Sequence, residues 1–289
     1  MIVITGATGR LGSQIVDRLL TRVPAGQVAV SVRDAAKAAG LAARGVRVRE
    51  AGFSDPASLA HAFEGASRVL IVSSNDPGAD AVTQHKTAID TARAAGAERV
   101  VYTSHQASAA DSRFDPMRSH AATEQYLAGQ SGKFTALGNG FYASTVPWLI
   151  GRALETGTLS APADGPVSWT AHADLAEAAA VVLAQEHPFE GVTPPLTAPD
   201  ALDLAEVAEI LSELTGRTIN RVVAEDDEWR AAQVEQGLSE ARAESSLGLF
   251  RAARRGEFAV TGPALGELLG RPATPLRSLL AGFAGRQPA

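Results

Sequence analysis

Short apolar runs alternate with longer amphipathic segments through the first half of the chain. The runs contain few polar residues, which is typical of strands covered on both faces in a parallel sheet. The expected strands are residues 2–4, 28–30, 46–48, 69–72 and 100–102. Segments with one apolar face, such as residues 11–20 and 82–92, predict the helices between them. This alternation predicts right-handed βαβ units and an α/β fold with a Rossmann-type, doubly wound parallel sheet.

The pattern changes after about residue 140. Strand-like pieces become short, at residues 167–169 and 195–197, and helical segments dominate. We therefore expect a dinucleotide-binding Rossmann domain over residues 1–150. Residues 151–289 are expected to form a smaller, mostly helical substrate lobe, partly interleaved with the sheet, with a substrate cleft beneath it.

One helix of this second half has clear boundaries in the sequence. Asp203 followed by Glu206 resembles a capping box at a helix start, and an apolar stripe follows at helical spacing. Gly216 then provides a residue that ends helices. The pattern predicts a helix that begins after Asp203 and stops at Gly216.

Composition excludes several classes of protein. Hydrophobic residues make up 45% and charged residues 20% of the 289, as in a folded globular protein. No apolar run approaches the ~20 residues of a membrane helix, and the N-terminus turns polar too early for a signal peptide. Without cysteine there are no disulfides, thiolate metal sites or cysteine nucleophiles. A net charge of −6 leaves no dominant basic footprint for nucleic acid.

These observations predict a cytoplasmic protein that binds neither membranes nor nucleic acid and acts on a small molecule. A homo-oligomer is compatible with the sequence. The six histidines lack the short spacings of a metal site, so no metal is expected.

The strongest motif is the glycine-rich turn between the first strand and the first helix. Gly6 allows the tight turn, Gly9 lets the backbone approach a diphosphate, and Gly12 lets the helix pack closely on the strand. The helix N-terminus adds free N–H groups and a partial positive charge. The expected contacts of a dinucleotide in this turn are Gly6, Thr8, Gly9, Arg10, Leu11 and Gly12.

The end of the second strand indicates which dinucleotide is bound. Arg33 follows the strand and Lys37 lies one helical turn beyond, which favours the 2′-phosphate of NADP(H) over NAD(H). Asp34 either accepts hydrogen bonds from the ribose hydroxyls or caps the next helix. Phe53 after the third strand packs on the adenine or in the core. Ser73, Ser74 and Asn75 follow the fourth strand, on the route to the nicotinamide.

Candidate catalytic residues lie on the fifth strand and the helix after it. His120 and Glu124 are four residues apart on one helix face, so a carboxylate beside the imidazole would raise the histidine pKa and supply a proton. A surface ion pair is the alternative. Ser104 and His105 end the fifth strand at the edge where open α/β sheets bind ligands. His85 faces the apolar side of its helix and is expected to be a buried structural residue.

Candidate substrate contacts follow the next strand. Asn139, Phe141, Tyr142 and Trp148 bring three aromatic rings and one amide close together in sequence. The rings either stack on a planar substrate or anchor the lobe.

Several segments together resemble a known family. They are GATGRLG (6–12), VRD (32–34), HKTAIDTARAAGAERVVYTS (85–104), NGFY (139–142) and HADLAEAAA (172–180). The chain resembles the NmrA-like, atypical short-chain dehydrogenase/reductases, and within them the type 2 NAD(P)H:quinone oxidoreductases and triphenylmethane-dye reductases. The resemblance implies an extended Rossmann fold, an NADPH site at Gly6, Gly9, Gly12 and Arg33, and redox work on a quinone or flat aromatic molecule.

Two features depart from related sequences. The Tyr-x-x-x-Lys pair of the wider superfamily is absent, because the matching helix has His120 and Glu124. Gly138 stands before Asn139 where that quinone-reductase subgroup typically has arginine. Both departures concern the substrate side of the site.

Three functions are compatible with this sequence. The leading hypothesis is an NAD(P)H-dependent oxidoreductase that transfers hydride to a quinone-like or polycyclic aromatic substrate. The second is a cofactor-dependent, monooxygenase-like tailoring enzyme of aromatic natural products. The third is a non-catalytic, NAD(P)-binding redox sensor of the NmrA type.

Overall fold

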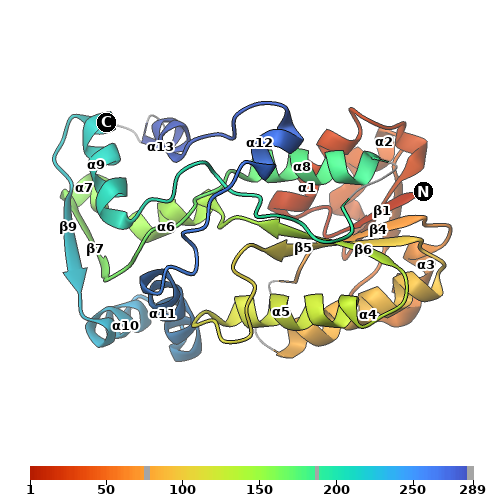
Figure 1. Ribbon diagram of the computed structural model, residues 1–289, viewed down its shortest axis with the longest axis horizontal. Coiled ribbons are helices and arrows are strands. Elements are labelled where there is room, and N and C mark those ends of the chain that lie inside the picture. The colour runs from red at the N-terminus through yellow and green to blue at the C-terminus, as the bar shows by residue number, and fades with distance from the viewer. Residues whose placement is uncertain (75–78, 186–188, 285–289) are drawn as a thin grey trace.

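The computed structural model describes residues 1–74, 79–185 and 189–284, and a seven-stranded parallel sheet forms its centre (Figure 1). The strands follow the order β3-β2-β1-β4-β5-β6-β8, which is the doubly wound arrangement that the sequence predicts. They are β1 (Ile2–Thr5), β2 (Val28–Val32), β3 (Arg47–Glu50), β4 (Arg68–Ile71), β5 (Arg99–His105), β6 (Lys133–Asn139) and β8 (Gly191–Val192). The strand order reverses between β1 and β4, where such sheets bind ligands.

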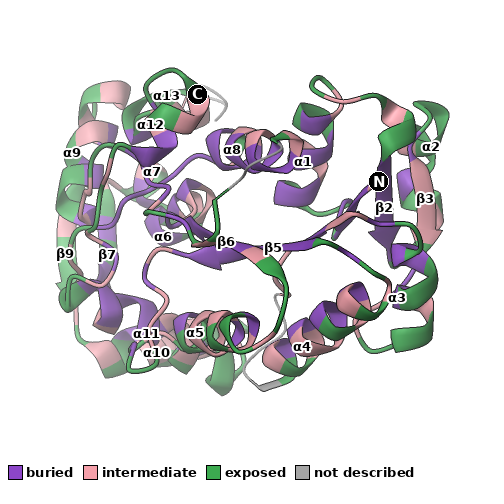
Figure 2. Ribbon diagram, turned by 45° about the vertical axis from the view of Figure 1, so that its right-hand side comes forward, coloured by how far each residue is buried: buried purple, intermediate pink, exposed green. Residues whose placement is uncertain are grey.

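Helices cover both faces of this sheet (Figure 1). One face carries α1 (Arg10–Leu19), α8 (His172–Ala184) and α12 (Ala264–Leu269). The other carries α3 (Pro56–Phe63), α4 (Ala79–Ala94) and α5 (Asp115–Ala128). The central strands are buried, whereas these helices turn exposed residues outward (Figure 2). The short α2 (Ala39–Ala43) precedes β3.

A second, smaller unit lies beyond the carboxyl end of the sheet (Figure 1). Its strands β7 (Thr158–Pro162) and β9 (Asn220–Ala224) pair in parallel. Its helices are α6 (Val146–Ile150), α7 (Ala153–Thr156), α9 (Leu204–Thr215), α10 (Asp226–Glu235), α11 (Glu240–Arg254) and α13 (Leu276–Ala284). No helix in the described parts of the chain is both long and apolar enough to cross a bilayer.

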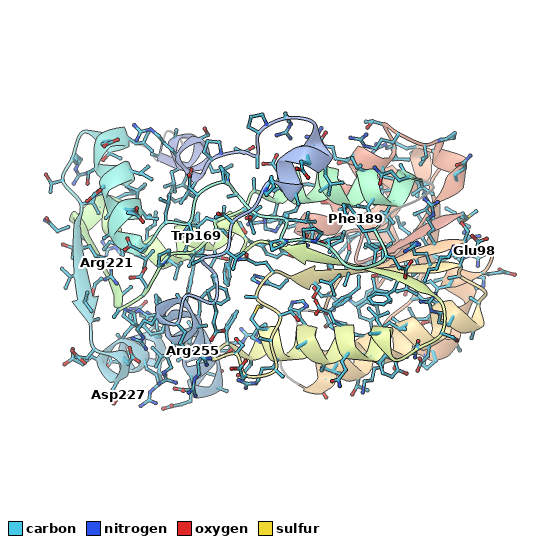
Figure 3. All side chains as sticks on the ribbon, in the orientation of Figure 1. Glu98, Trp169, Phe189, Arg221, Asp227 and Arg255 are labelled. Carbon is cyan, nitrogen blue, oxygen red and sulfur yellow. The ribbon has the colours of Figure 1, made fainter. Side chains whose placement is uncertain are left out.

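The two units are interleaved along the chain. The helix α8 follows residue 150 in sequence yet packs closely against α1 beside the sheet, and β8 extends the sheet itself. Residues 167–169 and 195–197 differ from the expected short strands. Each forms a single bridge, between Val167 and Leu202 and between Asn139 and Leu196. Trp169 is buried here, and its indole N–H donates to the Leu202 carbonyl at 2.9 Å (Figure 3).

The helix α9 confirms the boundaries read from the sequence. The Asp203 side chain accepts hydrogen bonds from the first-turn N–H groups, and Glu206 returns one to the Asp203 N–H at 2.9 Å. Gly216 adopts a left-handed conformation with φ +66° at the other end. Local sequence therefore determines both ends of this helix.

The segment after α12 is held to the sheet unit by one buried carboxylate. Asp174 of α8 is 1% exposed and accepts from Arg271 at 2.8 Å and from the Thr274 N–H at 2.6 Å. We expect Asp174→Ala to lower the free energy of unfolding by about 1–3 kcal/mol, because the Thr274 amide loses its partner in the interior. Urea denaturation measures the change. Glu177→Ala is the control, since Glu177 also binds Arg271 but is less buried; equal losses would contradict this account.

Candidate active site

The glycine-rich turn after β1 is shaped by contacts that exclude side chains. Gly6 has φ +62°, and the Gly9 N–H donates to the Gly6 carbonyl at 3.0 Å. A Cβ atom on Gly12 would lie 2.8 Å from the Gly6 carbonyl carbon and 3.1 Å from the Ala7 Cα. Only glycine at position 12 lets the start of α1 approach the turn this closely.

The N-terminus of α1 is left open by the same turn. Its N-cap is Gly9, which has no side chain to accept from the helix, and the first turn contains no acidic residue. Thr8 and Arg10 are exposed, whereas the Leu11 side chain is 6% exposed and belongs to the core. Leu11 can therefore offer a ligand only its backbone. Free N–H groups at a helix N-terminus are a site for phosphate.

An exposed guanidinium lies at the end of β2. Arg33 is exposed, and no described residue forms an ion pair or hydrogen bond with its side chain. Asp34 accepts from the Ala36 N–H at 3.0 Å and caps the next helical turn. Lys37 lies 3.7 Å from the same carboxylate. Of the two roles considered for Asp34, the structure shows the cap.

The remaining predicted coenzyme contacts lie along the same edge of the sheet. Phe53 is half-buried and packs against the core beneath α3 and α4. The Ser73 N–H donates to Thr103 Oγ1 at 2.8 Å, and the Ser74 N–H donates to Nε2 of His85 at 2.9 Å. The expectation for Asn75 falls outside the described residues.

The end of β5 brings Ser104 and Glu124 together. Ser104 is buried, and its hydroxyl donates to Glu124 Oε1 across the gap between β5 and α5. Burial raises the pKa of the Glu124 carboxyl, and the hydrogen bond from Ser104 opposes that rise in part. Among the described residues, no hydrogen bond or ion pair links Glu124 to His120.

The imidazole of His120 has a different partner from the one expected. Its Nδ1 lies 2.8 Å from the hydroxyl of Tyr102, which is fully buried on β5. The pKa of His120 lies well below its ordinary value, because burial and the nearby His105 and His85 rings disfavour a positive charge. The expectation that Glu124 raises this pKa was wrong, since the carboxylate turns to Ser104 instead.

His105 forms part of an aromatic cluster. Its ring packs edge-on against Phe141 and Phe258, with centroids 5.5 and 5.8 Å apart, and lies 6.2 Å from the ring of His120. Its Nδ1 accepts from the Ala107 N–H at 3.0 Å, while its buried Nε2 has no partner in the described structure. Burial lowers the pKa of His105 to about 3. A histidine this deeply buried stays neutral near pH 7.

The predicted substrate residues separate into two places. Asn139 is 1% exposed with an unpartnered Oδ1 in the described structure, and Phe141 and Tyr142 lie beside it after β6. Trp148 instead lines a cavity of about 650 Å³ between α6 and α10, together with Trp229. None of the other three lines that cavity. The structure thus joins Asn139, Phe141 and Tyr142 but not Trp148.

Tyr142 has a partner that sequence reasoning missed. Its ring lies 4.3 Å from the ring of His172, at the start of α8. Burial raises the pKa of Tyr142 to about 12. Burial and the nearby Arg10 lower the pKa of His172 to about 4. His172 thus contacts Tyr142 and lies near enough to Arg10, a residue of the glycine-rich turn, for that charge to lower its pKa.

Comparison with known proteins places this arrangement in a family. The model of the NmrA-like family matches residues 1–243. This chain belongs to the NmrA-like family. It is 34% identical over 277 residues to quinone oxidoreductase 2 of Escherichia coli, and the alignment covers 96% of each chain.

Two solved structures of related proteins have nearly the same fold. The crystal structure of the E. coli NADPH-dependent quinone oxidoreductase in complex with NADPH has a TM-score of 0.91 and 32% identity. It covers 98% of this NmrA-like chain and 99% of that chain. The Citrobacter sp. triphenylmethane reductase in complex with NADP(H) has a TM-score of 0.88 and 32% identity, with coverage of 98% and 100%. The predicted fold and family are both confirmed.

Tyr102 is the second residue that sequence reasoning missed. It lies in an apolar strand pattern, so its hydroxyl gives no signal of its own in the sequence. His85 is confirmed as a buried, hydrogen-bonded residue, at 1% exposure. Their connection to His120 depends on how α4 and α5 pack side by side on β5, and no local sequence pattern indicates it.

Buried neutral histidines should make this NmrA-like protein less stable in acid. Burial lowers the pKa of His85 to about 4 and that of His105 to about 3. Both titrate near 6.5 when unfolded, so between about pH 6.5 and 4 the unfolded chain binds more protons. We expect the free energy of unfolding to fall as the pH falls through this window, by about 3 kcal/mol for His85 alone. Urea denaturation between pH 7 and 4 measures the slope.

Two variants separate this effect from general acid sensitivity. His85→Gln removes the titrating group, so its stability should depend less on pH than that of the wild type. His61 is exposed on α3, and His61→Gln should keep the wild-type slope. If the His85 and His61 variants keep the same slope, the buried imidazole is not its source.

Proposed function

We propose that this chain is an NAD(P)H-dependent oxidoreductase that reduces quinone-like or polycyclic aromatic acceptors and prefers NADPH to NADH. One observation carries the proposal. The glycine-rich turn has no room for a side chain at Gly12, and the helix that follows it has no side-chain cap. Arg33, at the end of the neighbouring strand, is exposed and has no partner among the described residues. The likeness to an NADPH-dependent quinone oxidoreductase in complex with NADPH supports the same reading.

The residues of the turn fit a diphosphate. The backbone at Thr8 and Arg10 is exposed at the positive end of α1, whose N-cap makes no side-chain hydrogen bond, so the free N–H groups of the first helical turn would hold the diphosphate. Arg33 would hold the 2′-phosphate by a charge-assisted hydrogen bond. Asp34 caps the next helical turn through Oδ1. These features favour NADP(H).

The acceptor side offers flat apolar surface and few polar groups. When bound, the reduced nicotinamide supplies a hydride, and reduction of a quinone to a hydroquinone takes one further proton. Phe141 and Tyr142 would pack on a planar acceptor, and Asn139 Oδ1 would accept a hydrogen bond from a hydroxyl of the hydroquinone product. Two polar groups lie near the end of β5. They are the hydroxyl of Ser104, which donates to Glu124, and the imidazole of His120. His105 contributes packing, because it is buried and neutral.

Coenzyme oxidation with a panel of acceptors tests this function. NADPH consumption is followed without oxygen, using quinones of different size and a triphenylmethane dye. We expect acceptor-dependent oxidation with one hydroquinone formed for each NADPH. No turnover with any acceptor would reject the proposal. In a parallel assay in air, oxygen uptake with a hydroxylated product would indicate an oxygenating enzyme. Saturable coenzyme binding without turnover in either assay would indicate a sensor.

A further inference from the structure

A chain of hydrogen bonds connects a backbone amide after β4 to His120. It starts where the Ser74 N–H donates to Nε2 of His85 at 2.9 Å. A backbone N–H can only donate, so Nε2 of His85 carries no hydrogen. The His85 ring is neutral near pH 7, because burial lowers its pKa to about 4. Its hydrogen is therefore on Nδ1.

The hydrogen on Nδ1 of His85 determines which neighbouring hydroxyl groups donate and which accept hydrogen bonds. Nδ1 lies 3.0 Å from Thr123 Oγ1, and that hydroxyl donates to the Ser119 carbonyl at 2.9 Å. Tyr102 Oη lies 3.3 Å from the same Nδ1, so it accepts there. The phenol of Tyr102 also contacts Thr123, but Thr123 Oγ1 already accepts from Nδ1 of His85, so we assign the phenol hydrogen to Nδ1 of His120 at 2.8 Å. Tyr102 keeps that hydrogen, because burial raises its pKa.

His120 must then carry its own hydrogen on Nε2. Burial and the neighbouring imidazoles of His105 and His85 lower its pKa, so the ring is neutral and has one hydrogen. Its Nδ1 accepts from Tyr102, which leaves Nε2 for that hydrogen. No described residue bonds to Nε2, and the side chain is half-buried rather than enclosed. One N–H donor of fixed position is thus available to a ligand.

We propose that Tyr102 and His85 are positioning residues that hold His120 as its Nε2–H tautomer, and that this N–H donates a hydrogen bond to the oxygen of the bound acceptor. The inference rests on the proposed reduction of quinone-like acceptors. In that reaction the acceptor gains a hydride from the reduced coenzyme, which is oxidised, and a proton from water, while His120 keeps its hydrogen. A neutral donor suits this chemistry, because it stabilises charge on the acceptor oxygen as it develops.

Histidine tautomers are directly measurable in the protein without ligands. Long-range ¹H–¹⁵N spectra of labelled protein near pH 7 distinguish Nδ1–H from Nε2–H imidazoles. We expect His85 as Nδ1–H, and His120 as Nε2–H. His105 provides an internal standard, because the Ala107 N–H fixes it as Nε2–H independently of Tyr102. A His120 that carries its hydrogen on Nδ1 in the wild type would overturn the inference.

Tyr102→Phe removes the link and keeps the ring. We expect His120 to become a mixture of tautomers while His105 stays unchanged, and kcat for quinone reduction to fall at least about tenfold. KM and NADPH affinity should change little. Tyr126→Phe is the matched control, because Tyr126 lies on the same helix as His120 but its hydroxyl binds Asp90 at 2.7 Å. It should leave spectrum and kcat as in the wild type.

The outcomes separate this inference from the proposed function. An unchanged His120 tautomer in Tyr102→Phe would overturn it. So would a kcat equal to that of Tyr126→Phe. If the wild type reduces no quinone, the proposed function fails, while the spectra still decide the tautomer. If Tyr102→Phe does not fold, the wild-type spectrum alone decides it.

Discussion

Gly12→Ala should abolish useful coenzyme binding, with NADPH affinity reduced by about 100-fold or more. The new Cβ would lie 2.8 Å from the Gly6 carbonyl carbon and closer still to its oxygen. Backbone atoms cannot give way as a flexible side chain can, so α1 must move away from the turn. That shift displaces the N–H groups that face the diphosphate. Calorimetric titration with NADPH measures the loss.

A second glycine provides the control for Gly12→Ala. Gly40 lies in α2 with open space around its position and no unusual backbone angle. Gly40→Ala should bind NADPH as the wild type does and be equally or slightly more stable. Both variants are compared by circular dichroism to confirm the fold. Wild-type NADPH affinity in folded Gly12→Ala would show that the turn does not hold the diphosphate.

Arg33→Ala should convert the protein from a preference for NADPH to near indifference between the coenzymes. A charge-assisted hydrogen bond to phosphate contributes about 1.5–3 kcal/mol, which corresponds to roughly 10- to 150-fold in affinity. NADH has no 2′-phosphate, so its affinity should stay nearly constant. The ratio of the two dissociation constants, measured by titration at one fixed salt concentration, reports the effect.

Arg18→Ala controls for the loss of one positive charge. Arg18 is exposed in the last turn of α1, away from the glycine-rich turn. Its removal should reduce NADPH affinity little and leave the ratio of coenzyme affinities unchanged. Equal losses for NADPH and NADH in Arg33→Ala would place the 2′-phosphate elsewhere.

The sheet could be predicted because its signals are local. An apolar run such as Val69–Ile71 or Val100–Tyr102 has no polar alternation, and the structure buries both of its faces. The role of Gly12 could be read from its place after a strand and at the start of a helix. The capping box at Asp203 is also satisfied within four residues. Each of these features depends on neighbours in the sequence.

The pairing of side chains in the site could not be predicted in the same way. Helical spacing places His120 and Glu124 on one face, but their partners are chosen by β5, which brings Tyr102 to one and Ser104 to the other. Trp148 follows Phe141 closely in sequence, yet it lies on α6 and lines a cavity that Phe141 does not line. The partners of these side chains depend on how the helices pack on the sheet. The spacing of residues along the sequence does not determine that packing.

A crystal structure of the protein grown with NADPH tests the central claim most directly. We expect the diphosphate to lie against the N–H groups that follow Gly9, with the 2′-phosphate beside Arg33. A dinucleotide bound elsewhere on the protein, or a diphosphate that does not touch this turn, would contradict it.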